Sequence, residues 1–244
     1  MLTNGLTLVL GLFWEILQPL LMNAIMWFVF TFGLKMGNGG PMGFPFICYL
    51  FTGMLAWNYF SESLSGSTNV ITEYSFLVKK INFRLSILPV VKLLSAGIIS
   101  LIFLGIVILI LIYNGIYPSF WWLQFFYYIG AMMLLTLGLS WITSAMNVFV
   151  KDVGYVVSIL LQFGFWMTPI FWDVTVIPAK WQIFVKINPM AYIVNGYRDT
   201  FLLHKPFWEG DLFSMLWFWG FTIVSLLAGM IVFKRLRPHF ADVI

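Results

Sequence analysis

The sequence has 244 residues, of which 61% are hydrophobic and only 9% carry a formal charge. Soluble domains have a charged share of about 25%, and a chain of this length in water would still need a mostly polar surface. Its 13 Lys and Arg and 9 Asp and Glu residues cannot supply one, so the surface is expected to face lipid. The net charge of +4 comes from short basic clusters between apolar runs, which favours an anionic membrane surface and excludes nucleic acid as a partner.

The apolar runs predict membrane-spanning helices. A spanning helix needs roughly 20 apolar residues, and the runs here are continuous rather than alternating, which is typical of helices and not of a barrel. The first run has no basic region before it and is too long for a cleavable signal peptide, so it is expected to stay in the mature protein. The expected spans are 6–34, 44–72, 86–113, 119–149, 153–172 and 212–233 of a single domain over 1–244.

The connection between the fifth and sixth runs differs from the others. It covers about 173–211, carries several charges, and is broken by Pro178, Pro189 and Pro206. Its two apolar pieces within 178–203 are too short and too polar to cross a bilayer. Two short amphipathic helices that dip into one leaflet, or lie on it, fit this pattern.

The distribution of Lys and Arg predicts the orientation. On one side the connections carry Lys79, Lys80, Arg84, Lys151, Lys234, Arg235 and Arg237. On the other side they carry Lys35, Lys180, Lys186, Arg198 and Lys205, all but the first within the unusual connection. By the positive-inside rule, both termini and the segment 73–84 are expected in the cytoplasm, and the paired short helices outside.

Motifs for catalysis are absent from the sequence. It has no phosphate-binding G-x-x-x-x-G-K-[ST] loop and no H-E-x-x-H, and its histidines, His204 and His239, lack partners at metal-ligand spacing. Cys48 is the only cysteine, which excludes an internal disulfide. We therefore expect no catalytic, cofactor or metal site in this chain, and no ATP hydrolysis by it.

A basic segment with interleaved aromatic residues lies between the second and third runs, at 73–85. It is either a loop that anchors the protein to anionic lipid or a short cytoplasmic helix that docks on a soluble partner. Aromatic and Arg side chains are common anchors of protein interfaces, which suits docking. Composition alone does not decide between the lipid anchor and the docking helix.

Polar side chains recur at helical spacing in the second and fourth runs, so in each run they share one helix face. Such residues either bond one helix to another or line an aqueous path.

Aromatic residues make up 20% of the chain, and their faces suit sugar rings as well as lipid. The candidate lining residues are Trp57, Asn58, Tyr59, Phe60, Glu62, Ser65, Asn69, Ser140, Thr143, Asn147, Phe163 and Trp166.

Five segments have the order and spacing of a known family. They are Leu10–Leu20, Phe76–Pro89, Asn147–Asp152, Asn188–Asp199 and Phe233–Asp242. Together they resemble the permease subunits of type-two ATP-binding-cassette exporters for O-antigen, teichoic acid and related polysaccharides. Members of that family usually have an amphipathic cytoplasmic helix before the first span, whereas about five residues precede the first run here. A truncated sequence, a mispredicted start codon or the lack of the ATPase contact made by that helix would each explain this difference.

The resemblance implies a six-span subunit in the bacterial cytoplasmic membrane that pairs with a second copy and with two copies of a separate ATPase, which binds ATP and Mg. The implied substrate is a lipid-linked glycan. The coupling helix that docks on the ATPase would include Glu73, Tyr74, Phe76, Lys79, Lys80, Phe83 and Arg84. The outward-side gate would include Trp181, Asn188, Pro189, Tyr192, Tyr197, Arg198 and Asp199.

Two other functions stay open. One is a permease of the same type that exports a small hydrophobic compound, and the other is a membrane enzyme that acts on polyprenyl-linked sugars. Secondary transport is disfavoured because no inverted repeat is visible. A neighbouring gene for a phosphate-loop ATPase would favour the exporters, whereas its absence would exclude them.

Overall fold

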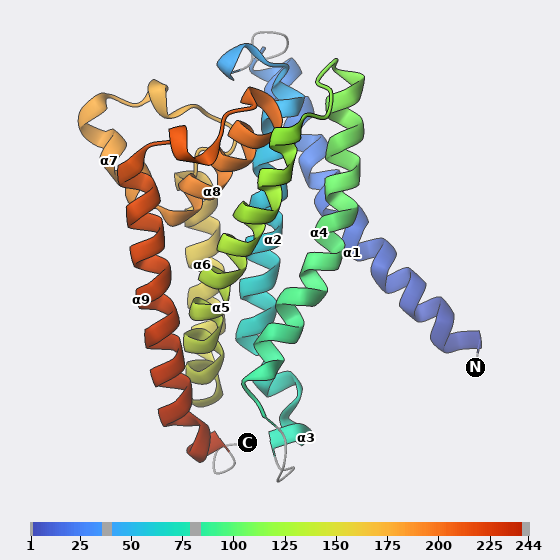
Figure 1. Ribbon diagram of the computed structural model, residues 1–244. Helices are drawn as coiled ribbons and strands as arrows, with labels where there is room; N and C mark the ends of the chain where they lie inside the picture. Colours follow the sequence, from blue (N-terminus) through green and yellow to red (C-terminus); the bar gives the residue numbers. More distant parts are fainter. Residues whose placement is uncertain (1, 36–40, 79–83, 241–244) are drawn as a thin grey trace.

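The computed structural model describes residues 2–35, 41–78 and 84–240, and these residues form helices and turns without a β-strand. Long helices form the body of the protein (Figure 1). They are α1 (Leu2–Phe28, continued by a π-helical turn to Gly33), α2 (Phe46–Glu73), α4 (Ile87–Tyr113), α5 (Phe125–Phe149), α6 (Asp152–Met167) and α9 (Leu212–Leu236). The first part of α1 leaves the bundle at an angle.

Four helical segments in the described residues are long and apolar enough to cross a membrane. They are Phe13–Gly33, Ile87–Tyr113, Phe120–Phe149 and Leu212–His239. The other two long helices do not meet this measure: α2 carries the polar stripe, and α6 has only 16 residues. The expected all-helical class is confirmed with these four candidate spans, whereas the full set of six spans stays a prediction.

α6 ends at Met167, before the expected end of the fifth span at residue 172. The cause is Pro169, since a proline disfavours helical backbone angles in the residue before it. Thr168 is accordingly extended, with φ −84° and ψ 136°, and its hydroxyl donates to the Gly164 carbonyl at 2.7 Å. The chain therefore leaves the helix at Thr168 and turns across the end of the bundle.

α2 lies at the centre of the bundle, where it contacts α1, α4, α5, α6 and α8. Its side chains Tyr49, Leu50 and Leu55 are buried. From α5, Met132 and Leu135 fill the space beside it and are also buried. The centre of the single chain is thus packed with side chains.

α5 and α9 pack with their backbones in contact, because glycine leaves the contact without a side chain. A Cβ atom at Gly138 would lie 2.6 Å from the Leu226 nitrogen and 2.9 Å from the Ser225 oxygen, and one at Gly229 would lie 2.5 Å from the Gly138 oxygen. Small residues four apart, here Ser225 and Gly229, allow this close approach of membrane helices.

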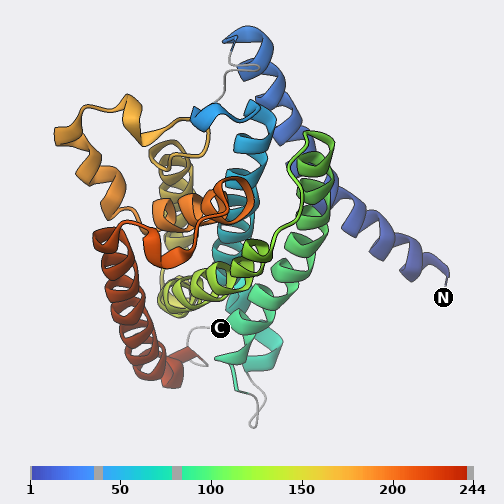
Figure 2. The same cartoon turned by 45° about the horizontal axis from the view of Figure 1, so that its top comes forward.

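The two ends of the bundle differ. One end carries α3 (Ser75–Val78) and the end of α9, and the other carries α7 (Gln182–Ile187), α8 (Pro189–Arg198) and the turn after α4 (Figure 1). Two short helices thus lie within the expected range 178–203. Figure 2, in which this end comes forward, shows α8 over the middle of the bundle and α7 at its rim.

The break between α7 and α8 follows from Asn188-Pro189. Proline has no N–H to donate but suits the first turn of a helix, and Pro189 begins α8. Asn188 caps the helix, because its side-chain oxygen accepts a hydrogen bond from the Met190 nitrogen at 3.0 Å.

Candidate functional site

A cleft of about 420 Å³ lies between α1, α2 and α6. Aromatic, thioether, amide and hydroxyl groups form its walls. The lining residues are Met22, Met26, Met54, Trp57, Asn58, Ser61, Leu161, Gln162, Phe165 and Trp166. The mixture of aromatic faces and hydrogen-bonding groups can hold a sugar, whose rings have both apolar and hydroxyl faces.

Helix α6 brings its aromatic residues close to α2 at one point. The rings of Trp57 and Phe165 lie with their centroids 5.8 Å apart in an edge-on arrangement. Gly164 permits this approach, because a Cβ atom there would lie 3.1 Å from the Trp57 ring. The aromatic wall of the cleft therefore depends on a glycine that sequence analysis did not single out.

The remainder of α6 is exposed. Val157 is the one buried residue of α6 in the described part of the chain. Leu160, Phe163 and Trp166 are more than half exposed. An apolar helix with so little cover needs lipid or another protein beside it. The cleft thus lies on an open flank of the bundle rather than along its packed axis.

The polar stripes of α2 and α5 meet each other. The Thr68 hydroxyl donates to the Thr143 hydroxyl at 2.9 Å, and the Asn147 side chain donates to the Asn69 oxygen at 3.1 Å. The Asn147 oxygen in turn accepts from the Gly154 nitrogen at 3.0 Å. Asn69, Thr143 and Asn147 therefore bond one helix to another, which is one of the two interpretations of the stripes, and the choice between them stays open.

At the end that carries α8, Arg198 is buried and joins three parts of the chain. It donates to the Pro169 and Ile170 carbonyls, at 2.6 Å each, and its guanidinium lies 3.5 Å from the centroid of the Tyr49 ring. Burial lowers the pKa of Arg198 to about 10, so it keeps its charge at neutral pH. This residue holds the chain after α6 against α8 and α2.

Tyr192 joins α8 to the helices beside it. Its hydroxyl lies 3.1 Å from the Tyr127 hydroxyl, which accepts a hydrogen bond from the Trp219 indole at 3.0 Å. Its ring stacks on Phe218 of α9 with centroids 4.9 Å apart. α8 is therefore tied to α5 and α9 by polar and aromatic contacts together.

The opposite end carries the segment predicted to dock on a partner. α2 continues to Glu73, whose carboxylate lies 3.2 Å from the Lys92 ammonium, and α3 follows. Tyr74 and Phe76 are exposed, and Phe76 is 60% exposed. Lys79, Lys80 and Phe83 lie outside the described residues, and Arg84 is exposed.

The structure places the candidate lining residues in different surroundings. Trp57, Asn58 and Trp166 line the cleft, and Tyr59 and Glu62 face a hollow between α1, α2 and α4. The rest lie elsewhere: Phe60 and Ser140 are buried, Phe163 is exposed, Ser65 is part-buried, and Asn69, Thr143 and Asn147 join helices. The role of all of them in a path stays a prediction.

Sequence analysis missed Gln162 and Ser61 in the cleft. Gln162 lies between Ser158 and Trp166 at steps of four, so a search for helical spacing in the fifth run could have found it. The methionines Met22 and Met26 carry no such signal. In the described residues, no group of three or more His, Cys, Asp or Glu side chains is placed to hold a metal ion.

Comparison with known proteins gives a consistent result. Residues 7–202 match the family described as ABC-2 type transporter. Two proteins of Klebsiella pneumoniae named O-antigen export system permease protein RfbA are each 27% identical, over 96% and 97% of this chain and 88% of their own length. A protein of the same name from Myxococcus xanthus is 26% identical over 96% of this chain and 87% of its own.

Proposed function

The chain belongs to the ABC-2 type transporter family, and from that premise we propose that it is the permease subunit of an exporter for lipid-linked cell-surface polysaccharide. One observation carries this proposal: nearly the whole chain is similar to proteins named as O-antigen export permeases. The open cleft with Trp57, Asn58 and Gln162 in its walls supports it, since these groups suit sugar rings.

A second copy of the chain is part of the proposal. A hydrated glycan cannot cross hydrocarbon, and the packed centre around Leu55, Met132 and Leu135 offers it no room. The cleft lies instead on the flank of the bundle, beside the exposed residues of α6. Two copies that face each other across such flanks would enclose a path, and closed two-fold symmetry is the commonest arrangement of soluble homo-oligomers.

The driving free energy comes from a separate ATPase, which binds ATP and Mg and is present in two copies. The exposed residues Tyr74 and Phe76 of the segment 73–85 support a docking role for that segment. Closure of the ATPase would then push on α2 and α4, which the segment connects. In this arrangement six helices span the bacterial cytoplasmic membrane, both termini are cytoplasmic, and α7 and α8 lie at the outward end as a gate.

The test is deletion of the gene, with separate measurement of surface polysaccharide and of lipid-linked glycan inside the cell. We expect the surface polymer to fall and the lipid-linked precursor to accumulate, with both restored by the intact chain. Complementation must fail when the partner ATPase carries a disabled phosphate loop. Normal surface polymer together with increased sensitivity to a hydrophobic antibiotic would instead indicate a small-molecule exporter.

A further inference from the structure

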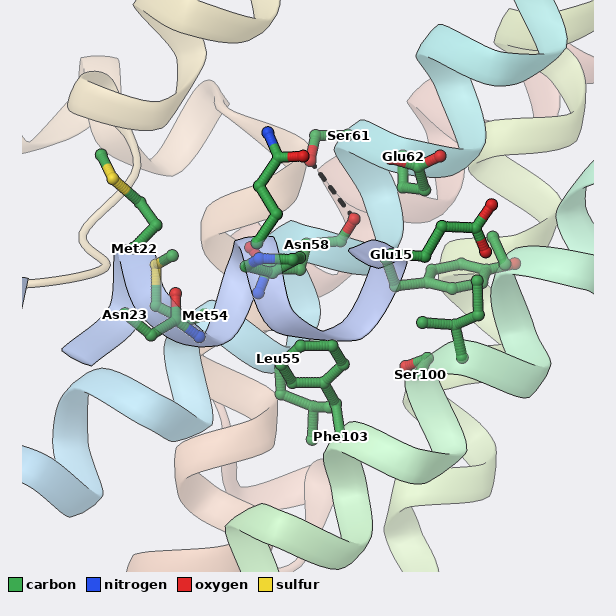
Figure 3. A pocket seen from close by; sticks show the side chains of 15 residues that line it. Glu15, Met22, Asn23, Met54, Leu55, Asn58, Ser61, Glu62, Ser100 and Phe103 are labelled. Carbon is green, nitrogen blue, oxygen red and sulfur yellow. Dashed lines mark hydrogen bonds between the residues drawn. The ribbon is translucent and has the colours of Figure 1, made fainter. Parts of the chain in front are cut away.

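A second hollow, also of about 420 Å³, lies between α1, α2 and α4 (Figure 3). It adjoins the cleft and shares Asn58 and Ser61 with it, but α4 replaces α6 as its third wall. Its volume lies within the range of about 300–1,000 Å³ that is usual for small-molecule sites. Nothing in the function proposed above requires a hollow on this side of α2.

Polar groups from three helices meet in this hollow. Its polar lining residues are Glu15, Gln18 and Asn23 of α1, Asn58, Tyr59, Ser61 and Glu62 of α2, and Ser100 of α4. The apolar lining residues include Phe103, which Figure 3 shows beside Leu55. Ionisable and amide side chains within a membrane are costly and usually functional.

Several of these polar atoms are buried and have no partner. Asn23 is 1% exposed and Ser100 is 4% exposed. The Asn23 side-chain oxygen, the Ser100 hydroxyl and the Asn58 side-chain nitrogen have no hydrogen-bond partner among the described residues. Buried polar groups in proteins are nearly always hydrogen-bonded, and these three atoms lack the partners that a polar occupant of the hollow would supply.

The charges of the lining restrict the occupant. Glu15 and Glu62 are acidic, and none of the described Lys, Arg or His residues lines the hollow. A phosphate or pyrophosphate group would therefore meet repulsion there. A neutral molecule rich in hydroxyls can instead form hydrogen bonds there, because the carboxylates and the Asn23 oxygen accept hydrogen bonds and the Asn58 nitrogen donates one. Tyr59 and Phe103 also line the hollow, with 2% and 4% of their surface exposed.

We propose that this hollow binds one neutral sugar unit of the exported glycan. The inference rests on the proposed function and deepens it, since it assigns recognition of the sugar to α1, α2 and α4 and keeps the phosphates of the lipid carrier away from this site. Asn23 and Ser100 contact the sugar hydroxyls, and Glu15 and Glu62 exclude anionic groups.

The experiment measures the access of water and sugar to Ser100. The assembled transporter with its ATPase, in lipid nanodiscs, carries Ser100→Cys and is labelled with an uncharged, water-soluble thiosulfonate. The unsubstituted chain, whose one cysteine Cys48 is buried, gives the background. Ser144→Cys is the matched control, because Ser144 is likewise buried without a partner in the described residues but does not line the hollow.

Labelling is repeated with N-acetylglucosamine, tetramethylammonium or inorganic pyrophosphate, each at the same concentration. We expect Ser100→Cys to react, Ser144→Cys to react at least tenfold more slowly, and only N-acetylglucosamine to slow labelling, by several-fold. Slowing by tetramethylammonium alone would make the site cationic, and slowing by pyrophosphate would make it anionic. No labelling, or no effect of any of the three, would also overturn the proposal, the last result indicating a hollow that holds water only.

A second variant separates the sugar site from general damage to the fold. Asn23→Leu added to Ser100→Cys should leave labelling intact but abolish protection by N-acetylglucosamine. Asn114→Leu removes an amide at the far end of α4, where it donates to the Ile110 carbonyl, and should leave protection unchanged. Protection that survives Asn23→Leu overturns the assignment of that residue.

The labelling result does not depend on export, so the two proposals fail in different ways. If the gene deletion lowers surface polysaccharide as expected but the sugar does not protect the cysteine, the sugar site is overturned and the permease assignment stands. Protection of the cysteine by the sugar in nanodiscs, together with a gene deletion that keeps its surface polysaccharide, would overturn the permease assignment and leave a sugar site without that role.

Discussion

Arg198 is a buried charge whose partners are two backbone carbonyls and an aromatic ring. Gly53 of α2 makes room for it, because a Cβ atom there would lie 3.0 Å from the guanidinium and 3.2 Å from the Ile170 oxygen. The planar guanidinium can bond both carbonyls and stack on Tyr49 at once, which the ammonium of lysine cannot. The residue is therefore specific in shape as well as in charge.

We predict that Arg198→Lys and Arg198→Leu both destabilise the protein, because each leaves at least one of the Pro169 and Ile170 carbonyls buried without a donor. The expected loss is about 2–4 kcal/mol for leucine and less for lysine. The thermal midpoint of the purified protein measures it. Arg235→Leu removes an exposed Arg and should change the midpoint little; an equal loss from both positions would contradict the argument.

Asn147 provides a test between the two interpretations of the polar stripes. If its bonds to Asn69 and Gly154 serve the fold, Asn147→Ala and Asn69→Ala should each lower stability by about 0.6–1.7 kcal/mol. The double variant should lose less than the sum, since both single variants break the same bond. A fall in export at unchanged thermal midpoint would show instead that these amides line a path.

The packing of α5 against α9 depends on two glycines, which have no side chain. No side chain separates the two helices at Gly138 and Gly229, so their backbones come into van der Waals contact along an apolar surface. In lipid, where hydrophobic driving force between helices is small, close packing of this kind supplies much of the attraction.

We expect Gly138→Val to force α5 and α9 apart and to lower stability by about 1–3 kcal/mol, as overpacking does. Gly220→Val, also in a long helix, is the matched control, because no described atom beyond the adjacent residues and the helix's own backbone lies within 4 Å of a Cβ atom at that position. The thermal midpoint in detergent is the measurement. Similar losses at both glycines would mean that valine itself, and not the contact, is responsible.

The protein is a bundle with two dissimilar ends. Arg198 and Tyr192 tie down α8 at one end, and exposed aromatic residues follow α2 at the other. If the second end is where the ATPase docks, loss of an aromatic anchor there should weaken the complex without affecting the bundle itself.

Phe76→Ala is therefore predicted to reduce the ATPase that co-purifies with the permease by about tenfold or more, the effect of losing an aromatic anchor from an interface. Phe120→Ala removes an exposed ring just before α5, in a turn that contacts the segment after α8, and should leave co-purification intact. A triple change of Lys79, Lys80 and Arg84 to Glu should act in the same direction as Phe76→Ala. Full recovery of ATPase with either variant would contradict docking at the segment 73–85.

The sequence predicted the class of the protein and the helices along the chain. The expected run at 86–113 agrees closely with α4, and the expected break at Asn188-Pro189 separates α7 from α8. Where the expectation was too long, at 153–172, the reason was local and visible, because Pro169 ends α6. Periodicity also placed Asn58, Asn69 and Asn147 on polar helix faces.

By itself, then, the sequence determined that this chain lies in a membrane and which stretches are helical, because hydropathy and backbone preference are properties of neighbouring residues. Only the tertiary structure decided what each polar face meets. It joined Asn69 to Asn147, left the Asn23 oxygen and the Ser100 hydroxyl without partners among the described residues, and buried Arg198 against carbonyls of another element. These pairings bring together residues far apart in sequence, and no periodicity within one helix encodes the neighbour against which its face will pack.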